Sequence, residues 1–138
     1  GEDASRTLSK GVGSLLWMAP ELLRGSRLKD SQAPPLDVYS YAIVMWEIWA
    51  RKMPWEELEG KGNFLIIRLS ELVNAGTRPE VPAQCEPAPD GYENLMHWCW
   101  AGHPNRRPTF PAIIKSLTPL RSQRRASASR NVAAESTL

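Results

Sequence analysis

The apolar positions of this chain recur at helical spacing, and the strongest such pattern runs from Asp37 to about Arg51. One stripe at i, i+3, i+4 and i+7 spacing comprises Val38, Tyr41, Ala42, Met45, Ile48 and Trp49. Further apolar residues occupy the other faces: Ile43, Val44 and Trp46. Because a helix that is apolar nearly all round is usually buried, the sequence predicts one central helix. Asp37 is its expected N-cap.

One shorter helix is predicted before the central helix and another after it, each separated from it by a loop. Pro20 suits the first turn of a short helix that Gly25 would end. Pro34-Pro35 predicts an extended approach to the central helix. A further helix is expected over residues 64–74, with Gly76 just beyond its end. The residues expected to face inward from it are Ile66, Leu69 and Val73.

Two more helices are predicted after a proline-rich loop over residues 77–90. The first follows Asp90, with Glu93 as a capping-box partner. Its shared apolar face comprises Tyr92, Leu95, Met96 and Cys99. Thr109 is the expected cap of the last helix, which ends before Pro119 and carries Phe110, Ile113, Ile114 and Leu117. The pattern therefore predicts a mainly α domain over residues 1–120.

Charge distinguishes residues 121–138 from the rest of the chain. This segment carries four arginines and one glutamate, a net charge of +3, and has no apolar periodicity. We expect a disordered basic tail. The first 120 residues carry a net charge of −1, which gives no reason to expect nucleic-acid binding.

Hydropathy and cysteine content further limit the classes of protein to which the chain could belong. No apolar run reaches the roughly 18–20 residues of a membrane span, and no secretory signal opens the chain. Cys85 and Cys99 are expected to be reduced thiols in a cytoplasmic protein. Cys99 lies near His97 and His103, but without a second Cys-x-x-Cys pair we expect no metal site.

Five short motifs, in order over residues 13–117, resemble the helical C-terminal lobe of a protein kinase, without its N-terminal lobe. They are Gly13–Glu21 with its Ala19-Pro20-Glu21, Asp37–Trp49 followed by Pro54-Trp55, Gly76–Pro79, Val81-Pro82, and Cys99-Trp100 with Pro104–Phe110. These motifs resemble those of the tyrosine kinases and of the tyrosine-kinase-like serine/threonine kinases. The resemblance implies that Glu21 forms a buried pair with Arg107, which would fix the activation segment to the lobe. It also implies that Asp37 accepts backbone hydrogen bonds from the catalytic loop.

The resemblance assigns a substrate-binding role to the residues before the Ala-Pro-Glu motif. Leu15, Leu16 and Trp17 would line the pocket for the residue after the phosphoacceptor, although plain core packing is an alternative. Ser14 stands where serine/threonine kinases carry a hydroxyl residue that contacts the catalytic loop. The preceding loop offers three candidate phosphosites: Ser5, Thr7 and Ser9.

The family's phosphoryl-transfer residues are not among these 138. The Gly-rich loop, the strand lysine, the catalytic-loop Asp and Asn, and the Asp-Phe-Gly aspartate do not occur. We therefore expect no catalytic residue here and no ATP or Mg²⁺ bound by this chain alone. The whole protein is expected to transfer the γ-phosphate of ATP to serine or threonine hydroxyls of proteins. A tyrosine kinase, a pseudokinase scaffold and a stand-alone interaction module are the alternatives.

The basic tail contains a candidate regulatory site. Arg124-Arg125-Ala126-Ser127 resembles the substrate pattern of basophilic kinases, so a regulatory kinase acting on Ser127 is a possible partner. Phosphorylation would lower the tail's net charge from +3 to about +1 and could weaken its contact with an acidic surface. The last residues, Ser136-Thr137-Leu138, also resemble a ligand for domains that capture a C-terminal carboxylate, if Leu138 is the natural end. A solvated tail without a partner is the simpler alternative.

Overall fold

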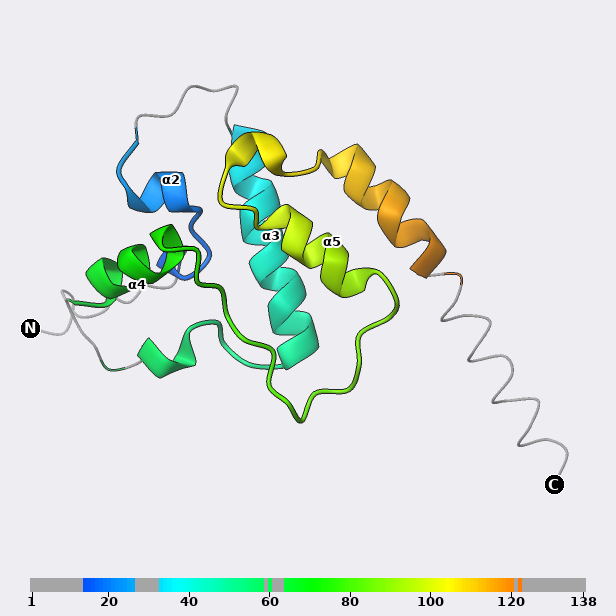
Figure 1. Cartoon of the computed structure of the whole chain (residues 1–138), viewed down its shortest axis with the longest axis horizontal. Coiled ribbons are helices and arrows are strands. Elements are labelled where there is room, and N and C mark those ends of the chain that lie inside the picture. Colours follow the sequence, from blue (N-terminus) through cyan, green and yellow to red (C-terminus); the bar gives the residue numbers. More distant parts are fainter. Residues whose placement is uncertain (1–13, 27–32, 59, 61–63, 121, 123–138) are drawn as a thin grey trace, which may run out of the picture.

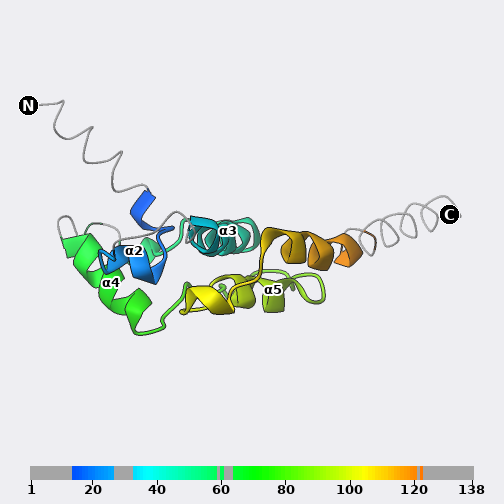
Figure 2. The same cartoon turned by 90° about the horizontal axis from the view of Figure 1, so that it is seen from above.

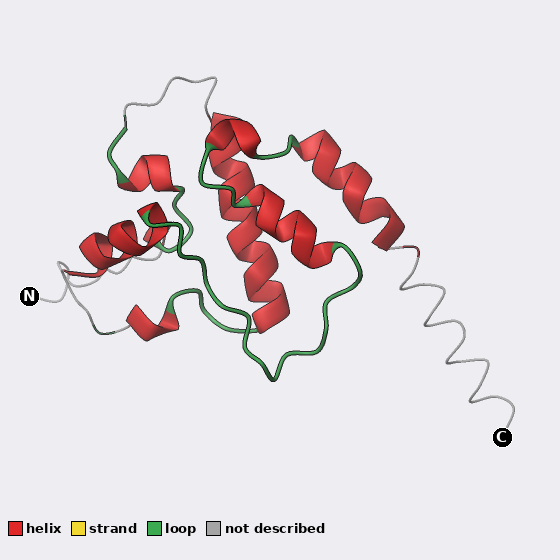
Figure 3. Cartoon of the chain, in the orientation of Figure 1, coloured by secondary structure: helices red, strands yellow, loops and turns green. Residues whose placement is uncertain are grey.

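The computed structural model describes most of the chain as helices joined by loops. The described residues are 14–26, 33–58, 60, 64–120 and 122 (Figure 1). No β-strand occurs among them, so the mainly α prediction is confirmed for this part of the chain (Figure 3). Within the same ranges, no helix combines the length and hydropathy needed to cross a membrane.

The central helix, α3, spans Ala33–Ala50 and runs through the middle of the fold (Figure 1). It begins four residues before the predicted start, because Pro34 and Pro35 form part of its first turn rather than an extended approach. Proline is tolerated in a first turn, where its backbone nitrogen needs no hydrogen-bond acceptor. Asp37 consequently lies inside the helix with an exposed side chain, and its prediction as N-cap is wrong.

Shorter helices surround α3 on two sides. Helix α5, Tyr92–Cys99, packs against α3, and residues 110–120 form a further helix beside it (Figure 2). Helices α2, Pro20–Leu23, and α4, Leu65–Asn74, pack against each other away from this layer (Figure 1). Two 3-10 turns, η2 at Glu56–Leu58 and η4 at Pro104–Arg106, complete the described elements.

The core lies between α3 and its neighbours. From α3 it takes Val38, Tyr39, Ala42, Ile43, Met45, Trp46 and Ala50, and from α4 Leu69 and Val73. Helix α5 adds Leu95, Met96 and Cys99, and the last helix adds Ile113. A buried central α3 is thus confirmed, with apolar contacts on most of its faces.

One face of α3 departs from the expected all-round burial. Val44 and Ile48 lie one turn apart, and their side chains are 39% and 67% exposed. Ile66 of α4 and Ile114 of the last helix, also expected inward, are 44% and 64% exposed. The apolar pattern marks residues able to be buried, and the described part of the chain places no segment over these four.

The helix ends follow the sequence in part. Gly76 has φ +92° after α4, a left-handed conformation that favours glycine and ends the helix as predicted. Thr109 Oγ1 accepts a hydrogen bond from the Ala112 amide (3.4 Å), which confirms the cap of the last helix. Before α5, however, the N-cap is Gly91 at φ +87°, without a side-chain cap. Instead, Glu93 Oε1 lies 3.7 Å from Nε2 of His97, one turn later in the same helix.

Candidate functional site

A buried ion pair joins two residues that are 86 positions apart in the sequence. Arg107 Nη1 donates to Glu21 Oε1 at 2.7 Å, and Nη2 donates to Oε2 at 2.9 Å. Each residue is only 7% exposed. The planar guanidinium thus binds both carboxylate oxygens through two parallel hydrogen bonds. The expected contact is present, with bidentate geometry.

Arg107 also contacts two further segments of the fold. Its Nη1 donates to the carbonyl of Pro35 in the first turn of α3, at 2.8 Å. Its Nε donates to the carbonyl of Ala101, just after α5, at 2.8 Å. One buried side chain therefore holds α2, α3 and the loop after α5 together. These neutral acceptors also satisfy donors that the Glu21 carboxylate does not reach.

The Glu21 carboxylate is positioned by the local backbone of α2. Ala19 has an extended backbone, and Pro20 begins the helix at N1 with a preset φ. Both residues are buried, so the start of α2 is packed against the core. Glu21 follows in the first turn, and its side chain contacts Arg107.

Two guanidinium groups lie over the ring of the buried Tyr39. The Cζ atoms of Arg107 and Arg78 are 5.1 Å and 5.2 Å from the ring centroid, distances typical of cation–π contacts. Arg78 donates to the carbonyls of Val73 (3.0 Å), Thr77 (2.7 Å) and Trp100 (3.1 and 3.0 Å). Tyr39 and Arg78 thus belong to the same anchor as Arg107.

Burial is the main cause of the pKa shifts of Tyr39 and Arg78. Desolvation raises the pKa of Tyr39 above 10, although the neighbouring charges of Arg78 and Arg107 act in the opposite direction. Desolvation also lowers the pKa of Arg78, and the charge of Arg107 adds to that effect. Neither residue has a role that the sequence alone predicts. The Gly76–Pro79 motif contained Arg78, but only the fold brings it to Tyr39.

The segment expected to contact substrate lies beside the anchor. Trp17 is half-buried, and its Nε1 donates to Glu47 Oε2 of α3 at 2.6 Å. Its carbonyl accepts a hydrogen bond from Ser40 Oγ at 2.9 Å. Leu15 and Leu16 pack against the core, and Ser14 is exposed. The segment is therefore held by α3, while its substrate-binding role stays a prediction.

The remaining expected site residues are not part of this geometry. Asp37 is exposed and makes no side-chain hydrogen bond within the described ranges, so its contact with a catalytic loop stays a prediction. The candidate phosphosites Ser5, Thr7, Ser9 and Ser127 lie outside the described residues.

The cysteine and histidine residues in and after α5 are buried or hydrogen-bonded within the fold. Cys99 is fully buried, and desolvation raises its pKa to about 11. His97 Nδ1 accepts a hydrogen bond from Trp100 Nε1 at 3.2 Å, and His103 Nδ1 accepts one from the Asn105 amide at 3.3 Å. Across the ranges that the structure describes, no group of three His, Cys, Asp or Glu residues could hold a metal ion.

The described residues form a helical lobe in which the Ala-Pro-Glu segment is bound to a distant arginine, Arg107. Both features are those that the resemblance to a protein kinase implies. The family model described as protein tyrosine and serine/threonine kinase matches residues 1–117. The chain therefore belongs to the protein tyrosine and serine/threonine kinase family, and it resembles the helical C-terminal lobe of that fold.

Several curated proteins are similar to this chain. A probable serine/threonine-protein kinase of Dictyostelium discoideum is 36% identical over 108 residues, 78% of this chain and 6% of the relative. Cyclic GMP-binding protein C of the same organism is 34% identical over 116 residues, 84% of this chain and 4% of the relative. Mitogen-activated protein kinase kinase kinase 7 of Homo sapiens is 33% identical over 118 residues, 86% of this chain and 18% of the relative. The chain thus spans less than a fifth of each relative.

Proposed function

We propose that this chain is part of a protein kinase that transfers the γ-phosphate of ATP to serine or threonine hydroxyls of proteins. In that kinase the chain would anchor the activation segment and supply part of the substrate-docking surface. The family match and the relatives named as serine/threonine kinases support the proposal. The observation that carries it is the buried bidentate contact between Glu21 and Arg107.

The anchor supports this role because it fixes the segment that would meet a substrate. Phosphoryl transfer depends mainly on positioning, so a displaced activation segment costs rate even when the reacting groups are intact. Glu21 follows Trp17 by four residues. Trp17 donates to Glu47 of α3, and Glu21 binds Arg107, which also contacts the first turn of α3. The contacts of Trp17 with Glu47 and Ser40 extend this attachment toward Leu15 and Leu16.

ATP and Mg²⁺ belong to the proposal for the longer protein only. The residues with which kinases hold these groups are not among the 138, so we assign this chain no step in phosphate chemistry. Its contribution is to bind and orient the protein substrate. We also propose a cytoplasmic location, which the free thiols of Cys85 and Cys99 support.

The test uses a longer protein that contains this chain together with a complete kinase domain. Purified protein is incubated with ATP, Mg²⁺ and peptide pools that differ only in serine, threonine or tyrosine as acceptor. We expect phosphoserine and phosphothreonine. Exclusive phosphotyrosine would favour the tyrosine-kinase alternative, and no transfer by a folded protein would favour a pseudokinase scaffold.

A variant then separates anchoring from chemistry. Arg107→Lys keeps a positive charge but loses the two parallel hydrogen bonds, so we expect a lower kcat on protein substrate with ATP affinity little changed. Thermal unfolding of the same variant reports whether the lobe is still folded at the assay temperature. Unchanged kcat in a folded Arg107→Lys variant would contradict the anchoring role.

A further inference from the structure

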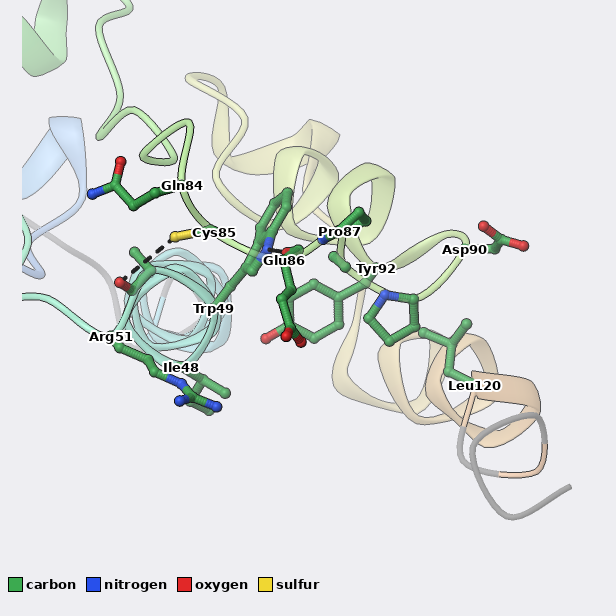
Figure 4. A pocket seen from close by; sticks show the side chains of 13 residues that line it. Ile48, Trp49, Arg51, Gln84, Cys85, Glu86, Pro87, Asp90, Tyr92 and Leu120 are labelled. Carbon is green, nitrogen blue, oxygen red and sulfur yellow. Dashed lines mark hydrogen bonds between the residues drawn. The ribbon is translucent and has the colours of Figure 1, made fainter. Parts of the chain in front are cut away.

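A pocket away from the anchor opens at the C-terminal end of α3. Its volume is about 820 Å³, and its walls come from residues 48–51, residues 84–90, Tyr92 and Leu120 (Figure 4). Figure 4 shows Leu120 and Asp90 toward one end of the pocket, and Ile48 and Arg51 toward the other. The pocket is therefore built from three separate stretches of the chain: the end of α3, the loop leading into α5, and the end of the last helix.

Hydrogen bonds fix the aromatic walls of this pocket. Trp49 Nε1 donates to the carbonyl of Glu86 at 2.8 Å, and Tyr92 Oη donates to the carbonyl of Met45 at 2.9 Å. The two rings meet edge to face, with centroids 6.2 Å apart. Because both aromatic side chains are already held, the pocket keeps its shape without an occupant, and little ordering cost remains for binding.

The charged groups at the pocket have no ion-pair partner among the described residues. Glu86 and Asp90 line it and are exposed, and Arg51 is the one cation in the lining. Neither carboxylate forms an ion pair within the described part of the chain, where the charged pairs involve other residues. The pocket thus offers two free carboxylates beside aromatic and proline surfaces, a combination that suits arginine side chains.

We propose that the basic tail of this same chain, residues 121–138, docks on this pocket and contacts Glu86 and Asp90. Leu120 lines the pocket, so the tail leaves the fold at its edge. Arg124 and Arg125 follow four and five residues later, within a reach of about 13–18 Å for an extended chain. The tail carries a net charge of +3, opposite in sign to the two carboxylates.

Tethering makes weak contacts sufficient for this docking. A single exposed ion pair changes an equilibrium by only a few-fold, but a short covalent link gives the tail an effective concentration in the millimolar range. Docking should therefore be partial and sensitive to salt, since exposed charges are screened beyond about 8 Å at physiological ionic strength. Phosphorylation of Ser127 would add about −1.5 to −2 charges between Arg125 and Arg130 and release the tail.

The half-buried thiol of Cys85, inside the pocket, allows the contact to be trapped in the full chain. Ser129→Cys places a second thiol in the tail, and the rate of disulfide formation with Cys85 is measured in oxidised glutathione by peptide mapping. Cys99 does not compete, because it is fully buried and its pKa is raised to about 11. In this background, Arg124→Glu/Arg125→Glu should slow the cross-link about five- to tenfold.

Two further arms make the result specific. Adding Glu86→Arg/Asp90→Arg to the reversed tail should restore the rate, because attraction returns with opposite signs. Arg68→Glu/Arg106→Glu, with the same change in net charge at two positions outside the pocket lining, should leave the rate unchanged. Phosphate on Ser127, added by a basophilic kinase, should slow it as charge reversal does. A rate independent of tail charge, or no rescue by the swap, would overturn the proposal and leave the pocket to another occupant.

Discussion

Replacing Arg107 with alanine should destabilise the fold by about 4–5 kcal/mol, because it leaves the Glu21 carboxylate buried without its partner. The substitution removes four hydrogen bonds: two to Glu21, one to the carbonyl of Pro35 and one to the carbonyl of Ala101. It also removes a cation over the ring of Tyr39. Hydrogen bonds to charged groups contribute about 1.5–3 kcal/mol each, but shared desolvation prevents the four from adding fully.

The reciprocal substitution should cost less. Glu21→Ala leaves the guanidinium two neutral acceptors, the carbonyls of Pro35 and Ala101, and its position over Tyr39. We therefore expect about 3 kcal/mol, at the lower end for a broken buried pair. The predicted order, Arg107→Ala worse than Glu21→Ala, follows from the number of partners that each side chain serves.

Urea unfolding of the chain, followed by circular dichroism and extrapolated linearly to water, measures both costs. Arg68→Ala is the matched control. Arg68 pairs with Glu71 at 3.2 Å, but both side chains are more than half exposed, so its loss should cost about 0.5 kcal/mol or less. If Arg107→Ala cost no more than Arg68→Ala, the claim that the buried pair holds the lobe together would be wrong.

Three further outcomes are expected from burial and titration. At pH 8 a thiol reagent should modify Cys85 but not Cys99 until the chain is unfolded, because burial raises the pKa of Cys99 to about 11; equal rates would contradict this. Burial also raises the pKa of Tyr92 to about 12, so stability should fall as pH rises from about 10 toward 12, and Tyr92→Phe should show a smaller fall. Met45→Ala should cost about 2–5 kcal/mol in urea unfolding, whereas Ile48→Gln, at a 67% exposed position, should stay within about 0.5 kcal/mol.

The sequence predicted the order of the helices better than their faces. Periodicity located α3, α4, α5 and the last helix, since each carries a repeated apolar stripe. It missed the start of α3, because a proline pair can either precede a helix or form its first turn. It also placed Ile48 and Ile114 in the core, although both are exposed in the structure. An apolar pattern shows which helix face can be buried, but not whether another segment covers that face.

The candidate site was predictable where a family motif named both partners. Glu21 and Arg107 are each part of a recognisable string, so their contact could be expected across 86 residues. Trp17 was expected near a substrate, but its hydrogen bond to Glu47 depends on how the segment packs on α3. No spacing rule connects these two positions, so only the fold could reveal the contact.

The cation–π contacts show why the anchor is more than one ion pair. Arg107 and Arg78 bring two positive charges to the ring of Tyr39, while Glu21 brings only one negative charge. The second charge is balanced by dipoles, because Arg78 donates to the carbonyls of Val73, Thr77 and Trp100 and faces the electron-rich ring. Val73 lies in the last turn of α4, Thr77 in the loop that follows it, and Trp100 is the C-cap of α5. Arg78 and Tyr39 therefore connect the packing of α4 to the residue that holds the Ala-Pro-Glu segment.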